Sequence, residues 1–230
     1  MESAWRDHGE FVDHEPRYST IRVDTKKKTV TASERKEEER NHWKEQAKEL
    51  DPNTLVFLDE SGSNIALTRL YARSPRGTRA WGSLPRNRRK NVTLLASLSL
   101  SGIGETMMLE GAANAQVFEL YIEQVLAPSL QKGQIVIMDN LSIHKGQKVR
   151  EVIEARGCHL LFLPAYSPDF SPIEEAFSKV KAVLRRVGAR THEALQEAIG
   201  QALLTVTAMD AAGWFTHCGY PPAPAQLQAS

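Results

Sequence analysis

Short apolar runs separated by turn residues dominate the middle of the chain. Residues 55–58 (Leu-Val-Phe-Leu) and 135–138 (Ile-Val-Ile-Met) are uninterrupted apolar runs, and residues 159–163 form a third, mostly apolar one. Runs of this length predict strands that are buried on both faces of a sheet. Residues 91–100 and 105–109 flank a Ser-Gly turn and predict a further pair of strands.

Helical patterns fill the intervals between these runs. One begins at Asn114 and is expected to end before Pro128, and a second is expected from about His144 to Arg156. A third follows Pro172, with an apolar face at Ile173, Ala176, Phe177, Val180, Leu184 and Val187. The order of strands and helices predicts an α/β protein of the ribonuclease H-like fold, with a mixed central sheet flanked by helices.

The two ends of the chain are more polar than its middle. A Thr31-x-x-Glu34 capping box predicts the start of a helix that reaches Leu50, with one narrow packing stripe. We expect four regions: a polar arm and connector helix (1–50), a catalytic domain (51–190), C-terminal helices packed on the core (191–220) and a disordered tail (221–230).

Composition excludes several classes of protein. The hydrophobic fraction of 41% and the charged fraction of 25% are typical of a globular protein, and no apolar run approaches the roughly 20 residues of a membrane span. The first residues are polar and do not form a signal peptide. Cys158 and Cys218 have neither metal nor redox spacing, so we expect a reducing, cytoplasmic environment.

The net charge of +1 hides a strongly basic segment. Eight basic residues and no acid lie between Arg69 and Lys90, where residues 69–73 and 79–81 are expected to form a hairpin around a Ser-Pro-Arg-Gly turn. This imbalance suits a phosphate backbone, although a solvated hairpin would have the same composition. The candidate DNA contacts in this segment are Arg76, Arg86, Arg88, Arg89 and Lys90.

Two aspartates follow apolar runs directly. Asp59 comes after residues 55–58 and Asp139 comes after residues 135–138. Ligands collect at the carboxyl ends of parallel strands, so adjacent strands would bring the two acids together. Each acid taken alone is equally typical of a turn. His144, five residues after Asp139, is either near this site, where it is a further candidate DNA contact, or a residue at the start of a helix.

Glu174 has two possible roles. In Ser171-Pro172-Ile173-Glu174 it occupies the third position of a helix in capping-box spacing, and spacing alone favours that role. The alternative is a metal ligand, with Lys181 and Arg185 as phosphate contacts along the same helical stripe. A solvated helix face would show the same stripe.

Three blocks of sequence resemble the DDE transposases of the mariner superfamily, most closely the bacterial insertion-sequence branch. They are Leu58-Asp59-Glu60-Ser61, Asp139-Asn140-x-x-x-His144 and residues 163–174 (Leu-Pro-Ala-Tyr-Ser-Pro-Asp-Phe-Ser-Pro-Ile-Glu), and 34 residues separate the second and third acids as in that branch. Ala165 and Ser171 differ from the residues usual in the family. Family members usually begin with helix-turn-helix units, for which this chain starts too late, so we expect a split gene or a remnant.

The resemblance implies a metal-dependent DNA strand transferase. Asp59, Asp139 and Glu174 would hold two Mg²⁺ or Mn²⁺ ions, and the partners would be double-stranded DNA at transposon ends and target and a second copy of the chain. It also implies a bacterial, nucleoid-associated protein of the cytoplasm. The alternatives are an inactive or trans-acting remnant that binds DNA, and a nuclease on the same fold that never joins strands.

Overall fold

The computed structural model describes residues 33–87 and 90–223 of the 230-residue chain. A five-stranded sheet has the strand order β3-β2-β1-β4-β5. β1, β4 and β5 are parallel, whereas β2 pairs antiparallel with both β1 and β3. The mixed sheet predicted from the order of elements is therefore confirmed. The strands are β1 (Leu55–Ser63), β2 (Val92–Ser99), β3 (Gly102–Glu110), β4 (Ile135–Met138) and β5 (His159–Phe162).

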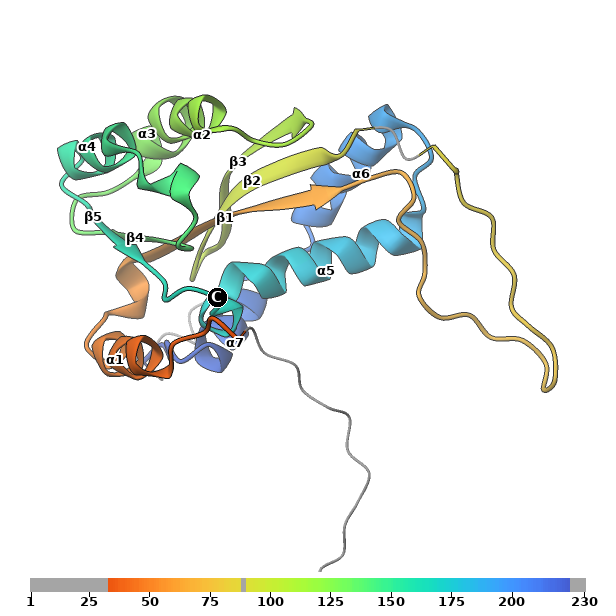
Figure 1. Cartoon of the computed structure of the whole chain (residues 1–230), viewed down its shortest axis with the longest axis horizontal. Helices are drawn as coiled ribbons and strands as arrows, with labels where there is room; N and C mark the ends of the chain where they lie inside the picture. Colours follow the sequence, from red (N-terminus) through yellow and green to blue (C-terminus); the bar gives the residue numbers. More distant parts are fainter. Residues whose placement is uncertain (1–32, 88–89, 224–230) are drawn as a thin grey trace, which may run out of the picture. The chain divides into compact units, whose positions relative to one another are not determined.

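Helices cover both faces of this sheet, as Figure 1 shows, with α2, α3 and α4 on one face and α5, α6 and α7 on the other. Among the described residues the helices are α1 (Glu37–Lys48), α2 (Ala115–Tyr121), α3 (Ala127–Ser129), α4 (Gln147–Ala155), α5 (Pro172–Val187), α6 (His192–Leu203) and α7 (Ala208–His217).

Successive side chains of β1 pack into two separate hydrophobic cores, one on each face of the sheet. Leu55 and Phe57 pack with the side chains of α5, α6 and α7, whereas Val56 and Leu58 pack with those of α2 and α4. Alternation of this kind follows from the two-residue period of a strand. It explains why the sequence of β1 begins with an uninterrupted apolar run.

Residues 64–91 contain no regular secondary structure in their described part, so the hairpin strands predicted at 69–73 and 79–81 are wrong. The turn between them exists, because the Thr78 amide donates to the Pro75 carbonyl at 3.1 Å. Figure 1 shows this segment leaving the end of β1 as an extended excursion before β2. Its side chains are too polar and too exposed to offset the entropy cost of an ordered pair of strands.

The first helix is shorter than predicted and better packed. α1 begins at Glu37 rather than after Thr31, which lies outside the described residues. The Trp43 indole donates to the Tyr220 hydroxyl at 2.9 Å, and that hydroxyl donates to the Phe170 carbonyl at 2.9 Å. The N-terminal helix and the end of the chain's described part are thus joined through a buried hydrogen-bonded chain.

Three helix predictions need correction. The helix after Asn114 does not end before Pro128, because a π-helical stretch (Ile122–Leu126) leads into α3, and proline is tolerated in the first turn of a helix. His144 belongs to a 3₁₀ helix (Ser142–Lys145) that precedes α4. Val187, at the end of α5, is exposed, whereas the other five predicted positions of that face are buried.

Most of the predicted disordered tail, residues 224–230, lies outside the described residues, as does the polar arm up to residue 32. The predicted division of the chain at residues 50 and 190 stays a prediction. None of the helices within residues 33–87 and 90–223 is long and apolar enough to cross a membrane.

Candidate active site

Asp59 lies within β1 and not at its end, which corrects the prediction of a strand-end residue. β1 continues to Ser63 because it pairs antiparallel with β2 along that length, where Asp59 faces Ala96. Its parallel pairing with β4, however, stops at Leu58 and Met138. Asp59 and Asp139 are each the next residue after this last parallel pair, so the sheet register places them side by side.

Asp139 begins the loop that follows β4. One of its carboxylate oxygens accepts a hydrogen bond from the Leu141 amide at 3.1 Å and lies 2.6 Å from Nδ1 of His144. Two contacts to the same oxygen fix the orientation of this carboxylate. The side chain stays about one-third exposed, with 38% of its surface accessible.

Glu174 is in the first turn of α5, as the sequence predicted, but the capping box is not formed. Ser171 is the N-cap residue and its side chain makes no capping hydrogen bond, while Pro172 follows at the start of the helix. The spacing argument that favoured a capping role for Glu174 is therefore wrong. Proline removes one unsatisfied amide from this turn, which lowers the need for a side-chain cap.

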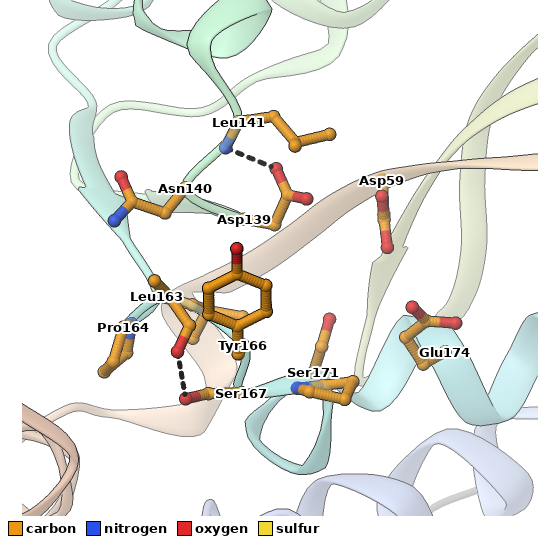
Figure 2. A pocket seen from close by; sticks show the side chains of 12 residues that line it. Asp59, Asp139, Asn140, Leu141, Leu163, Pro164, Tyr166, Ser167, Ser171 and Glu174 are labelled. Carbon is orange, nitrogen blue, oxygen red and sulfur yellow. Dashed lines mark hydrogen bonds between the residues drawn. The ribbon is translucent and has the colours of Figure 1, made fainter. Parts of the chain in front are cut away.

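The three acids line one pocket of about 300 Å³. Figure 2 shows the Asp59 carboxylate between those of Asp139 and Glu174, at the junction of β1, the end of β4 and the first turn of α5. Tyr166 stands beside the same pocket, 57% exposed, with a backbone φ of 55°. A left-handed conformation is costly for a residue with a side chain, and such strain collects at functional sites.

Electrostatics make this pocket a good site for a cation. Burial raises the pKa of Asp59 to about 7, and repulsion from Glu174 and Asp139 adds to that effect. None of the described residues that line the pocket is Lys or Arg. Three carboxylates without a positive neighbour in their own pocket are hard oxygen donors of the kind that bind Mg²⁺ and Mn²⁺.

His144 is fully buried and offers no exposed surface for the predicted DNA contact. Its ring packs against Phe118 at a centroid distance of 4.3 Å, and its Nδ1 contacts Asp139. A histidine in this position orients a carboxylate rather than reaching a ligand. Glu60 lies on the opposite face of β1 from Asp59, and burial raises its pKa as well.

The candidate DNA contacts fall in two places. Arg76, Arg86 and Lys90 are exposed in the 64–91 segment, together with the apolar side chains Leu70, Tyr71, Trp81 and Leu84. Arg88 and Arg89 lie outside the described residues. The other two candidates, Lys181 and Arg185, are partly buried on α5 and follow Glu174 along that helix.

Sequence reasoning missed the buried Arg40, which is only 2% exposed. Its guanidinium donates to both carboxylate oxygens of Asp169, at 3.0 and 2.6 Å, and stacks over Phe170 at 4.2 Å. In the sequence, Asp169 is typical of a turn residue and gives no sign of this partner. The signal that could have found the pair is that Arg40 continues the helical stripe of Trp43 and Ala47, the face of α1 that packs.

The fold and the site together are those of the ribonuclease H-like class, with an acidic pocket where the parallel pairing of β1 and β4 ends. Residues 54–196 match the family described as DDE superfamily endonuclease. This match spans more than half of the chain, and the chain belongs to that family.

Solved structures of Mos1 share the fold. The Mos1 strand transfer complex matches with a TM-score of 0.67 and 16% identity, over 87% of this chain and 64% of that chain. The Mos1 mariner paired end complex with Mn matches with a TM-score of 0.64 and 17% identity, over 86% of this chain and 64% of that chain. The Mos1 transposase catalytic domain with raltegravir and Mn matches with a TM-score of 0.59 and 16% identity, over 83% of this chain and 92% of that chain. No curated protein sequence matches the chain significantly.

The family is therefore that of the DDE superfamily endonucleases, and the fold is shared with the catalytic domain of Mos1 transposase. The chain spans about two-thirds of the length of the Mos1 chains in the DNA complexes, and most of the length of the Mos1 catalytic domain. The finer activity is therefore proposed below from the site.

Proposed function

We propose that this chain cleaves DNA at transposon ends and transfers the resulting 3′-hydroxyl to target DNA, using two Mg²⁺ or Mn²⁺ ions held by Asp59, Asp139 and Glu174. The observation that carries the proposal is the meeting of these acids in one pocket that no described Lys or Arg lines. Asp59, Asp139 and Glu174 would hold the ions, which would supply Lewis-acid activation of water and of a DNA 3′-hydroxyl and stabilisation of the leaving oxygen.

Each acid contributes something different to that site. Asp59 is held inside the sheet and is 9% exposed, so its position is set by the backbone of β1. Asp139 is oriented by His144 and the Leu141 amide. Glu174 is exposed on the first turn of α5, where it can approach an ion or the DNA from solvent. Two fixed ligands and one accessible ligand suit a site that exchanges its substrate.

DNA binding is assigned to the basic residues of the 64–91 segment and of α5. Arg76, Arg86, Lys90 and the neighbouring Arg88 and Arg89 would contact phosphates through the 64–91 segment, and Lys181 and Arg185 would do so from α5. The solved structures of Mos1 include paired end complexes. Two ends handled together require two active sites, so we infer a homodimer.

We also propose that the chain belongs to one particular branch of the DDE transposases. The spacing of 34 residues between Asp139 and Glu174 and the block at residues 163–174 favour the bacterial insertion-sequence branch of the mariner superfamily. A protein of that branch would act on DNA in the bacterial cytoplasm, at the nucleoid.

A supercoiled plasmid that carries the DNA flanking the reading frame on both sides tests the activity. We expect nicking and joining of a labelled 3′-hydroxyl end with Mg²⁺ or Mn²⁺, and neither product with EDTA or with Asp139→Asn. Nicking without joined product would support the nuclease alternative instead. Binding without either product at saturating metal would support the DNA-binding remnant.

A further inference from the structure

A second cluster of possible metal ligands lies where the end of α7 meets the first turn of α5 (Figure 1). Glu175 is in that turn, His217 is the last residue of α7, and Cys218 follows it. His217 Nδ1 contacts the Glu175 carboxylate, and one donor atom from each of the three residues lies within 4.8 Å of the other two. No role in the proposed DNA chemistry uses these side chains.

The donor set differs from that of the acidic pocket. Asp59, Asp139 and Glu174 offer oxygen only, whereas this cluster offers imidazole nitrogen, sulfur and one carboxylate oxygen. Sulfur and imidazole select borderline and softer ions such as Zn²⁺ over Mg²⁺. Three protein ligands also leave a fourth tetrahedral position for water or another donor.

The thiol is free to act as a ligand. Cys218 is not in a disulfide and its sulfur makes no hydrogen bond among the described residues, whereas Cys158 donates to the Gln131 carbonyl at 3.0 Å. Cys218 and His217 both line a surface pocket that also contains Trp43 and Gly219. A small ion therefore has a path to the sulfur although Cys218 is only 6% exposed.

We propose that Glu175, His217 and Cys218 form a binding site for one Zn²⁺-like transition-metal ion, separate from the Mg²⁺ site. Formation of the metal–sulfur bond breaks the S–H bond, and the proton leaves to solvent, with no change of oxidation state. Burial, reinforced by the charges of Glu175 and Asp169, raises the pKa of this thiol to about 12. Zn²⁺ and other thiophilic ions replace the proton on sulfur, whereas Mg²⁺ prefers oxygen ligands.

An ion at this position would join two elements that matter for the acidic pocket. Glu175 is the residue next to Glu174, but a helix turns by about 100° per residue, so their side chains leave α5 in different directions. The ion would tie the first turn of α5 to the end of α7. The turn that carries Glu174 would then be held by metal–ligand bonds in addition to its apolar packing.

Cobalt titration tests this site independently of DNA cleavage, because Co²⁺ bound to a thiolate gives a charge-transfer absorption in the near ultraviolet that oxygen ligands do not give. The full chain, reduced and saturated with Mg²⁺, should develop this band and saturate at one equivalent of Co²⁺. Added Zn²⁺ should then remove it by competition. Absence of the band in the parent chain would overturn the proposal.

Variants locate the ligands. Cys218→Ser should abolish the band, and Glu175→Gln and His217→Gln should each weaken Co²⁺ binding by more than about tenfold, since loss of a ligand costs more than loss of a supporting residue. Cys158→Ser is the matched control and should keep the band. His217 is exposed, so His217→Gln keeps the test decisive should Cys218→Ser unfold. Unchanged affinity in His217→Gln, or loss of the band only in Cys158→Ser, would refute the assignment.

Discussion

The acidic pocket and the 64–91 segment are both expected to meet DNA, yet they are built in opposite ways. Asp59 lies in a mostly buried strand and Asp139 follows another, and Glu174 extends from a helix with a mostly buried apolar face. In the 64–91 segment every described side chain from residue 69 to residue 84 is exposed, and no strand or helix holds it.

This contrast separates two requirements of the same enzyme. Metal chemistry depends on positions that are accurate to a fraction of an ångström, so its ligands are placed on packed elements. Non-specific affinity for a phosphate backbone depends mainly on charge, which an extended segment supplies without a fixed geometry. Substitutions in the two regions should therefore change different measurements.

The largest effect is expected at Glu174. Glu174→Gln keeps the size and helix propensity of the side chain but removes a charged ligand, and Mg²⁺-dependent nicking should fall by well over ~10²-fold, beyond the loss caused by a supporting residue. Because Ser171 makes no side-chain cap, no capping role complicates this result. Glu151→Gln, at an exposed glutamate of α4, is the matched control and should retain nicking. Full activity in Glu174→Gln would show that Glu174 is not a metal ligand.

A smaller effect, on folding alone, is expected at the ion pair of Arg40 and Asp169. Asp169→Ala leaves the buried Arg40 without its partner, and the free energy of unfolding should fall by about 2 kcal/mol, less than for a fully buried pair because Asp169 is half exposed. Urea unfolding measures this change. Glu39→Ala, which breaks the exposed pair with Lys36, is the control and should change stability by less than ~0.5 kcal/mol.

The contribution of the Arg40–Asp169 ion pair to the free energy of unfolding should depend on pH. Burial works to raise the pKa of Asp169, but Arg40 outweighs it and lowers that pKa below its ordinary value. Since the folded-state pKa lies below the unfolded-state value, the stabilisation is present above the unfolded value of about 4 and is lost as the pH falls through the folded one. The stability difference between the parent and Asp169→Ala should shrink in acid. A difference that is constant with pH would show that the ion pair is not its origin.

Local sequence predicted the strands that carry Asp59 and Asp139 because both are short apolar runs that end on a carboxylate. It did not predict that β1 continues past Asp59, since that extension depends on pairing with β2, a contact distant in sequence. The capping box at Glu174 failed for a related reason: the spacing was right, but the direction of the Ser171 side chain is decided by the fold.

Long-range packing also explains the other differences. Arg40 and Asp169 are 129 residues apart, and neither residue alone indicates a buried ion pair. His144 was correctly expected near Asp139, but its complete burial depends on Phe118 in α2. The strands predicted in the 64–91 segment followed from the turn signal alone, without a partner surface to stabilise them.

Metal binding should stabilise the pocket and leave the extended segment unaffected. Mg²⁺ that binds only the folded state adds RT ln(1 + [L]/Kd), about 1.4 kcal/mol at roughly ten times Kd, and should raise the melting temperature of the parent chain. Asp139→Asn should show a much smaller metal-induced shift, although its metal-free form should melt higher because one repelling charge is gone. Equal shifts in the two proteins would place the ions elsewhere.

The smallest effect on stability, with a clear effect on DNA, is expected in the 64–91 segment. Replacing Arg76, Arg86 and Lys90 by Gln removes only exposed charges, so the free energy of unfolding should change by less than ~0.5 kcal/mol. For every phosphate that the protein no longer neutralises, the slope of log K against log salt should become shallower by about 0.9. Titration of a labelled duplex at several salt concentrations measures that slope, with Lys48→Gln and Lys132→Gln as exposed controls outside the segment. A flatter slope with unchanged unfolding would show that affinity and geometry are supplied by different parts of the chain. An unchanged slope would make the segment a solvated loop and leave Lys181 and Arg185 on α5 as the remaining candidate DNA contacts.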